Sequence, residues 1–274
     1  MTHRLIFMAF FAACLTACQE KPREVVRQVD AEETTKAPEW KAHAMLGYEV
    51  IRELPHDAGA FTQGLLMSDG DWIESTGGYG TTSIRRVERE TGKVLLKKDL
   101  PEEFFGEGVA EMDGKLYQLT WQNQKGFVYD GKTLEPLGDF KYEGEGWGLT
   151  GDGQSLILSD GSDRLRYLDP KDFRVWRELR VTFNGKPVNL LNELEYIEGE
   201  IFANVWHNEV ILRIRPTDGV VVGVIDLTGI DAKEKRRDRE HVLNGIAYDS
   251  EAKELFITGK CWPKIYQIRL VPKK

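Results

Sequence analysis

The chain has 274 residues, of which 41% are hydrophobic and 30% are charged, and its formal net charge is −8. This length supplies enough apolar surface for one sizeable domain with its own core. The net negative charge and the lack of a long basic block exclude nucleic acid as an expected partner, because binding a phosphate backbone requires clustered Lys and Arg side chains.

The first 18 residues have the pattern of an exported lipoprotein. His3 and Arg4 precede the apolar run Leu5–Ala13, which is too short to cross a bilayer. Leu-Thr-Ala-Cys at 15–18 resembles a bacterial lipobox, in which the cysteine becomes lipidated and forms the new N-terminus. The alternative is an ordinary signal peptide with a coincidental cysteine. We expect lipidation at Cys18 and a place in the bacterial cell envelope, periplasmic or at the outer membrane, with membrane contact through the lipid alone.

Residues 19–45 are charged and poor in aromatics, and we predict that they form a flexible tether. After this segment the chain repeats itself. Segments that open at a Gly or Glu, continue through apolar residues and reach a polar turn are Gly64–Gly70, Gly108–Gly114, Gly148–Gly153, Glu193–Gly199 and Gly245–Ser250. A second and a third β-rich run follow each turn. Asp-Gly between alternating apolar runs is typical of a β-hairpin.

The spacing of these repeats predicts the fold. Propeller blades repeat every 40–50 residues or so, which agrees with the spacing in this chain. Strands this short cannot bury both faces alone, so the blades must stack around a common axis. We therefore predict an all-β chain in which residues 46–274 form one five-bladed β-propeller. The fifth repeat lacks a fourth strand, and the segment Gly47–Arg52 is expected to supply it and close the ring.

Propeller geometry brings together the start of each first strand and the end of each second strand, at one mouth of the channel. The residues just before the first strands are Gln63, Glu107, Trp147, Asn192 and Asn244. The residues at the ends of the second strands are Gly77, Trp121, Asp160, Trp206 and Lys260. Three indoles, a carboxylate, an ammonium and several amides thus converge on one opening, which predicts a binding site.

Within this ring, Glu107 has the side chain best suited to move a proton. Among indoles its pKa should rise by desolvation, which suits a general acid/base, although a carboxylate there could instead only cap turn amides. The five histidines are scattered, so we expect no metal site, no cofactor and no Cys–His nucleophile. The mixed-charge run Lys233–Glu240 is expected to be a solvated loop.

Ordered motifs across residues 46–270 carry a family resemblance. They include Phe-Thr-Gln-Gly-Leu at 61–65, Phe-Gly-Glu-Gly at 105–108, Gly-Glu-Gly-Trp-Gly-Leu-Thr at 144–150 and Thr-Gly-Lys-Cys-Trp-Pro at 258–263. With these motifs the chain resembles the plant and bacterial glutaminyl cyclotransferases, metal-independent propeller enzymes that convert N-terminal glutamine to pyroglutamate. The resemblance implies a five-bladed propeller and Glu107 as the catalytic acid/base. The pocket residues that it implies are Phe61, Gln63, Phe105, Trp121, Trp147, Asn192, Trp206 and Lys260.

The expected reaction uses these groups in separate roles. The substrate's α-amine attacks its own γ-carbonyl and expels ammonia, while Glu107 carries the proton between the two nitrogens. Lys260 and Asn192 are expected to donate to the oxyanion. The expected substrates are peptides or proteins with N-terminal glutamine. The enzyme is expected to be a monomer. Three alternatives stay open: a carbohydrate-binding propeller, a scaffold that holds peptide ends, and a glycosidase that pairs Asp160 with Glu107.

Overall fold

The computed structural model describes residues 45–231 and 238–273, and every regular element in these ranges is a β-strand. Within them, no helix has the length and apolar character needed to cross a bilayer. The signal peptide, Cys18 and residues 19–44 of the expected tether lie outside the described residues. Met45, the last residue assigned to that tether, is the first residue of β1.

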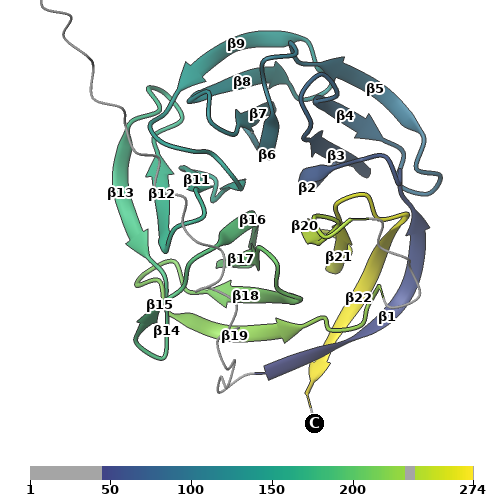
Figure 1. Cartoon of the computed structure of the whole chain (residues 1–274), viewed down its shortest axis with the longest axis vertical. Helices are drawn as coiled ribbons and strands as arrows, with labels where there is room; N and C mark the ends of the chain where they lie inside the picture. The colour runs from purple at the N-terminus through teal and green to yellow at the C-terminus, as the bar shows by residue number, and fades with distance from the viewer. Residues whose placement is uncertain (1–44, 232–237, 274) are drawn as a thin grey trace, which may run out of the picture. The chain divides into compact units, whose positions relative to one another are not determined.

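Three antiparallel sheets each contain four strands that follow one another in the chain (Figure 1). The first is β2 (Thr62–Ser68), β3 (Asp71–Thr76), β4 (Ser83–Val87) and β5 (Val94–Asp99). The second is β6 (Gly106–Met112), β7 (Lys115–Thr120), β8 (Lys125–Asp130) and β9 (Pro136–Lys141). The third is β10 (Leu149–Gly151), β11 (Leu156–Ser159), β12 (Arg164–Leu168) and β13 (Val175–Arg180).

An eight-stranded sheet joins the two ends of the described chain. One part of it is β16 (Leu191–Ile197), β17 (Glu200–Val205), β18 (Val210–Ile214) and β19 (Val221–Asp226). The other part is β20 (Leu243–Asp249), β21 (Glu254–Gly259), β22 (Lys264–Pro272) and β1 (Met45–Pro55). β1 pairs antiparallel with β22 and, over two residues, parallel with β19. The expected pairing of the segment from Gly47 with the last strand is therefore confirmed. A short hairpin, β14 (Thr182–Phe183) and β15 (Lys186–Pro187), forms a separate sheet.

Two of the Asp-Gly pairs form two-residue tight turns, as the sequence predicts. Asp69–Gly70 joins β2 to β3, and its φ angles are 51° and 84°. Asp113–Gly114 joins β6 to β7, and its φ angles are 51° and 69°. A two-residue loop of type I′ needs positive φ at both positions, which Asp tolerates and Gly accepts without steric cost. These turns hold β2 against β3 and β6 against β7.

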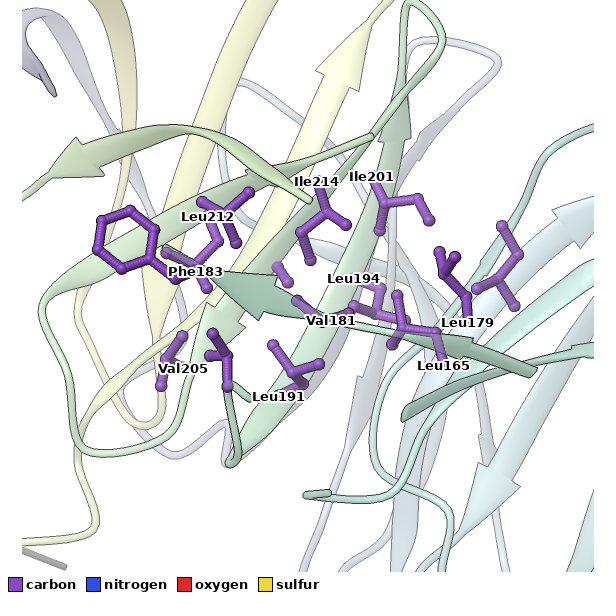
Figure 2. Packing of buried hydrophobic residues seen from close by; sticks show 14 of the residues in the cluster. Leu165, Leu179, Val181, Phe183, Leu191, Leu194, Ile201, Val205, Leu212 and Ile214 are labelled. Atoms are coloured by element: carbon purple, nitrogen blue, oxygen red, sulfur yellow. The ribbon is translucent and has the colours of Figure 1, made fainter. Parts of the chain in front are cut away.

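The hydrophobic core lies between neighbouring sheets. Figure 2 shows the cluster where Leu165 and Leu179, from β12 and β13, meet Leu194 and Leu212, from β16 and β18. These side chains are at most 4% exposed. Comparable clusters fill the spaces between other neighbouring sheets and between the two parts of the eight-stranded sheet. Because a sheet inside this arrangement is covered on both faces, β11 begins with three consecutive apolar residues, Leu156–Leu158, rather than alternating apolar and polar ones.

The first strands of successive sheets contact one another around the centre, in the cyclic order β2, β6, β10, β16, β20 and back to β2 (Figure 1). Their approach is so close that a side chain would not fit. A Cβ at Gly148 would lie 2.0 Å from the carbonyl oxygen of Asn192, and one at Gly108 would lie 2.4 Å from the amide nitrogen of Leu149. This close approach of the backbones explains why the repeats that begin at Gly108 and Gly148 open with a glycine.

Candidate active site

A pocket of about 200 Å³ lies where the first strands begin. Its lining is Phe61, Gln63, Phe105, Glu107, Trp121, Trp147, Asn192, Trp206, Glu240 and Lys260. The structure thus brings together all nine pocket residues that the sequence analysis selected. Glu240 is an addition, because it belongs to the charge run that was expected to be a solvated loop.

Irregularities in the inner strands aim three of these side chains. The pairing of first and second strands breaks between Thr62 and Gly64, between Gly106 and Val109, and between Leu191 and Leu194. Gln63, Glu107 and Asn192 lie in these breaks. A bulge removes a residue from the ladder and redirects its side chain, here toward the pocket. The sequence analysis placed the three residues just before their strands. In the structure each strand begins one residue earlier, with a residue that is paired before the bulge, so the strands include all three.

Glu107 is a buried carboxyl group, 5% exposed, and Gln63 Nε2 donates to its Oε1 at 3.1 Å. Burial raises the pKa of Glu107 well above its ordinary value of 4.5, and the charge of Glu145 acts in the same direction while Lys260 opposes it. The rise expected from the sequence is confirmed. A carboxyl group whose pKa is raised in this way is suited to accept a proton from a substrate and return it.

Lys260 places a cation in the same buried space. Its side chain is 5% exposed, and burial lowers the pKa of its ammonium while the charges of Glu107 and Glu240 oppose that change. The Nζ atom lies 4.8 Å from the ring centre of Phe61, a cation–π distance. The next residue along, Cys261, donates its backbone N–H to the Ala60 carbonyl at 2.7 Å, which ties the lysine loop to the segment before Phe61.

Aromatic rings form the walls of the pocket. Phe105 packs edge-to-face on Phe61 at 6.1 Å and on Trp121 at 5.9 Å between ring centres. Trp147 meets Trp206 edge-to-face at 5.6 Å. These walls keep water away and lower the local polarity, which strengthens electrostatic interactions inside the pocket.

Asn192 and Glu240 add polar groups at different depths. Asn192 is 3% exposed, and among the described residues no protein group hydrogen-bonds its side-chain amide. That amide can therefore bind a ligand. Glu240 is at the rim, where its Oε1 lies 3.6 Å from Nε2 of His207.

The comparisons agree with this geometry. The sequence profile of the glutamine cyclotransferase family matches residues 24–270. The chain belongs to this family. It is 44% identical over 234 residues to the glutaminyl-peptide cyclotransferase of Arabidopsis thaliana, which spans 84% of this chain and 73% of the relative. The crystal structure of Myxococcus xanthus glutaminyl cyclase matches with a TM-score of 0.80 and 38% identity, covering 84% of this chain and 99% of that chain. The family resemblance drawn from the motifs is confirmed.

Three members of the expected ring do not line the pocket of this cyclotransferase-family chain. Asn244 donates through Nδ2 to the Thr62 carbonyl at 2.9 Å and to Gln63 Oε1 at 3.4 Å, so it supports the site from outside. Gly77 lies against the Phe105 ring. Asp160 accepts hydrogen bonds from the backbone and hydroxyl of Ser162 and pairs with Arg166 at 3.4 Å. This position removes the basis for a glycosidase that pairs Asp160 with Glu107.

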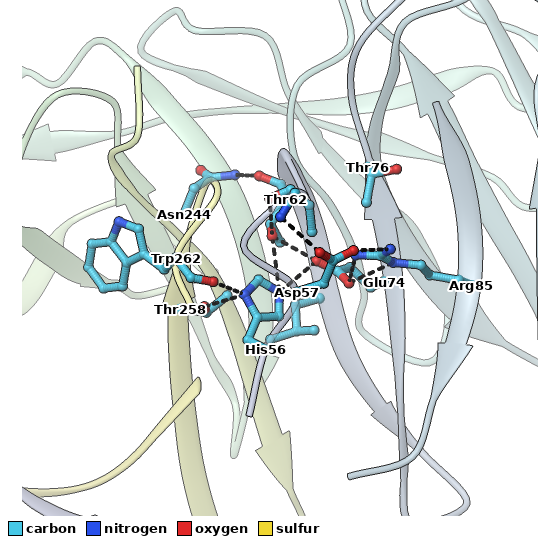
Figure 3. A network of polar contacts seen from close by, with 12 residues as sticks. His56, Asp57, Thr62, Glu74, Thr76, Arg85, Asn244, Thr258 and Trp262 are labelled. Atoms are coloured by element: carbon cyan, nitrogen blue, oxygen red, sulfur yellow. Dashed lines mark hydrogen bonds and ion pairs between the residues drawn. The ribbon is translucent and has the colours of Figure 1, made fainter. Parts of the chain in front are cut away.

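A buried polar network supports two pocket segments (Figure 3). Glu74 accepts from Thr62 Oγ1 at 2.7 Å and from Arg85 Nε at 2.9 Å, and it lies 2.9 Å from His56 Nε2. Burial alone would raise the pKa of Glu74, but the charges of His56 and Arg85 lower it to about 2. His56 also contacts the Trp262 carbonyl through Nδ1 at 2.5 Å. The network therefore links the strand that carries Gln63 to the loop that carries Lys260.

Two larger hollows lie elsewhere. One, of about 490 Å³, runs across β22 and its neighbours, and its Arg213 and Arg269 pair with Glu200 and Glu49. The other, of about 460 Å³, lies where the first strands end. Over residues 45–231 and 238–273, no group of three or more His, Cys, Asp or Glu side chains could hold a metal ion.

Proposed function

We propose that this protein is a glutaminyl-peptide cyclotransferase, which converts the N-terminal glutamine of peptides and proteins to pyroglutamate and releases ammonia. The observation that carries the proposal is Glu107: a buried carboxyl group of raised pKa, walled by indoles and accompanied by Lys260. The family membership and the similarity to the glutaminyl-peptide cyclotransferase of Arabidopsis support the same reaction.

The proton transfers follow from the position of Glu107. Its carboxylate takes a proton from the substrate's α-ammonium, and the free amine attacks the γ-carbonyl to close a five-membered ring. The protonated Glu107 then gives its proton to the amide nitrogen, which leaves as ammonia when the C–N bond breaks. The new ring nitrogen loses its extra proton to the same carboxylate, and that proton departs with ammonia as ammonium.

The remaining groups stabilise and orient the substrate. The tetrahedral intermediate carries a negative oxygen, and the Lys260 ammonium and the Asn192 amide are the donors that can bind it. Trp121, Trp147 and Trp206 hold the side chain in a folded rotamer and keep out the water that would otherwise yield glutamate. Gln63 orients the carboxyl group of Glu107, because its Nε2 donates to Glu107 Oε1 while its own oxygen accepts from Asn244.

The fold is proposed to be a five-bladed β-propeller. Each four-stranded sheet supplies one blade, and the eight-stranded sheet supplies two, which β1 and β19 join at their edges. The cyclic contact order of the first strands supports this interpretation.

We also propose a cellular location for the enzyme. The lipobox at Leu15–Cys18 favours a lipid anchor on Cys18 in the bacterial cell envelope, with the catalytic domain a monomer on the exported side.

The experiment measures ammonia and product mass after the purified full-length protein is incubated with the dipeptide Gln-Ala. We expect equal amounts of ammonia and pyroglutamyl-Ala. Asn-Ala, which would form a four-membered ring, and N-acetyl-Gln-Ala, which lacks the nucleophile, should both remain intact. If Gln-Ala also stays intact while the protein retains a glycan, the carbohydrate-binding alternative replaces the enzyme.

A further inference from the structure

One carboxylate behind the pocket holds two of its walls together. Glu145 Oε2 accepts a hydrogen bond from Trp121 Nε1 at 2.7 Å and another from Trp147 Nε1 at 2.9 Å. Its other oxygen accepts from Gln122 Nε2 at 3.1 Å. Trp121 follows β7, whereas Trp147 precedes β10, so the two indoles belong to different sheets. Glu145 therefore bridges neighbouring sheets at the mouth of the pocket.

The loop that carries Glu145 is itself fixed from behind. The buried guanidinium of Arg166, on β12, donates to the backbone carbonyl of Glu145 at 2.9 Å and also to that of Glu143. Gly146 donates its backbone N–H to the Trp121 carbonyl at 2.9 Å. These contacts set the direction of the carboxylate before any substrate binds, which is what preorganisation of a site requires.

The chemistry of indole explains why an acceptor is needed at this position. The indole N–H can only donate a hydrogen bond. A partly buried N–H without an acceptor costs free energy, so an indole orientation that leaves it unpaired is unfavourable. One carboxylate oxygen with two lone pairs satisfies both indoles at once. Its charge makes the bonds stronger than bonds to a neutral acceptor.

The same charge acts on the acid/base residue. The titratable groups that face Glu107 are Lys260, Glu145 and Tyr142. Burial raises the pKa of Glu107, Glu145 raises it further, and Lys260 lowers it. Removing the charge of Glu145 should therefore lower the pKa of Glu107.

We propose that Glu145 is a positioning residue for the cyclisation: it fixes the indoles of Trp121 and Trp147 as the walls that hold the substrate's glutamine side chain in its reactive rotamer. This inference rests on the proposed function.

The test compares three variants of the full-length protein. Glu145→Leu removes both acceptors, and Glu145→Gln removes the charge but keeps one oxygen for the indoles. Glu143→Gln, which makes the same charge change on an exposed side chain of the same loop, is the control. We expect kcat/KM for Gln-Ala to fall about 10²-fold in Glu145→Leu, the loss typical of a 1 Å misplacement, and less in Glu145→Gln. In Glu145→Gln the acid limb of kcat/KM should move to lower pH, and Glu143→Gln should match the wild type.

A second readout does not depend on activity. The indole N–H resonances of Trp121 and Trp147, assigned with Trp→Phe variants, should move in ¹⁵N-edited NMR spectra of both Glu145 variants and stay in place in Glu143→Gln. Unchanged indole resonances would overturn the positioning role, and so would a wild-type kcat/KM in Glu145→Leu. If Glu145→Leu does not fold, Glu145→Gln decides: wild-type resonances and an unmoved acid limb overturn the inference. If the wild type forms no pyroglutamate, the proposed function fails, while the resonances still test the indole contacts.

Discussion

Replacing Gly77 with alanine should displace Phe105 and thereby misshape the pocket. A Cβ at Gly77 would lie 2.3 Å from Cε1 of Phe105 and 3.1 Å from Cγ of Gln63. Carbon atoms in contact prefer about 3.5 Å, so the ring must retreat by about 1.2 Å, the difference between the two carbon–carbon distances. Phe105 packs against Phe61 and Trp121, so its shift would also move the walls on either side.

A displacement of this size should cost kcat/KM about 10²-fold for Gln-Ala, because 1 Å of misplacement has effects of that order. The added methyl group should cost about 1–3 kcal/mol of unfolding free energy, as overpacking usually does. Steady-state ammonia release and urea unfolding measure the two effects. Gly47→Ala is the matched control, because its Cβ would only approach Val271 Cγ2 at 3.8 Å. A Gly77→Ala enzyme with wild-type kcat/KM would refute the role of Phe105 as a wall.

Three further predictions concern proton transfer, stability and location. Glu107 must be ionised to take a proton, and burial raises its pKa. The acid limb of the pH profile of kcat/KM should therefore lie well above pH 4.5. An acid limb at pH 4.5 would contradict this. His56→Gln should cost about 1–3 kcal/mol in urea unfolding, because buried Glu74 loses one of its three partners while Arg85 and Thr62 remain. Burial lowers the pKa of His56, but the charge and hydrogen bond of Glu74 raise it to a net value above 6.5. This stabilisation is therefore complete below pH 6.5 and is lost as pH rises through the raised pKa. A difference from wild type that stays constant into alkaline pH would count against it. Cys18→Ser should abolish acyl labelling and membrane retention without loss of cyclisation, and a mature N-terminus elsewhere than Cys18 would disprove the anchor.

Repeat symmetry is why so much of the site could be predicted from the sequence. In a propeller, the position of a residue within its repeat fixes its height along the channel, and the order of the repeat fixes its angle around it. Gln63, Glu107 and Trp121 could therefore be placed at one opening without any knowledge of side-chain contacts. The Asp-Gly turns were predictable for a similar reason, because only a tight hairpin uses two consecutive residues with positive φ.

The directions of individual side chains were not predictable in this way. Asp160 has the same repeat position as Trp121, but it turns to Ser162 and Arg166. Glu145 is in a motif that the sequence analysis quoted, but its role depends on a guanidinium from β12 and on two indoles from different sheets. Glu240 lies outside the repeats altogether, in a charge run that is usually solvated. Each of these outcomes depends on tertiary contacts that no local pattern encodes.

The most direct test of the central claim is the turnover of Glu107→Gln on Gln-Ala at saturating substrate. The amide keeps the size and much of the hydrogen bonding of the carboxyl group but cannot carry a proton. Turnover should fall by about 10²–10⁴-fold or more, the usual contribution of general acid/base catalysis, while substrate binding changes much less. Glu111→Gln, the same change toward the other end of β6, should leave turnover unchanged. Near-normal turnover in Glu107→Gln, or equal losses in the two variants, would contradict Glu107 as the acid/base of this enzyme.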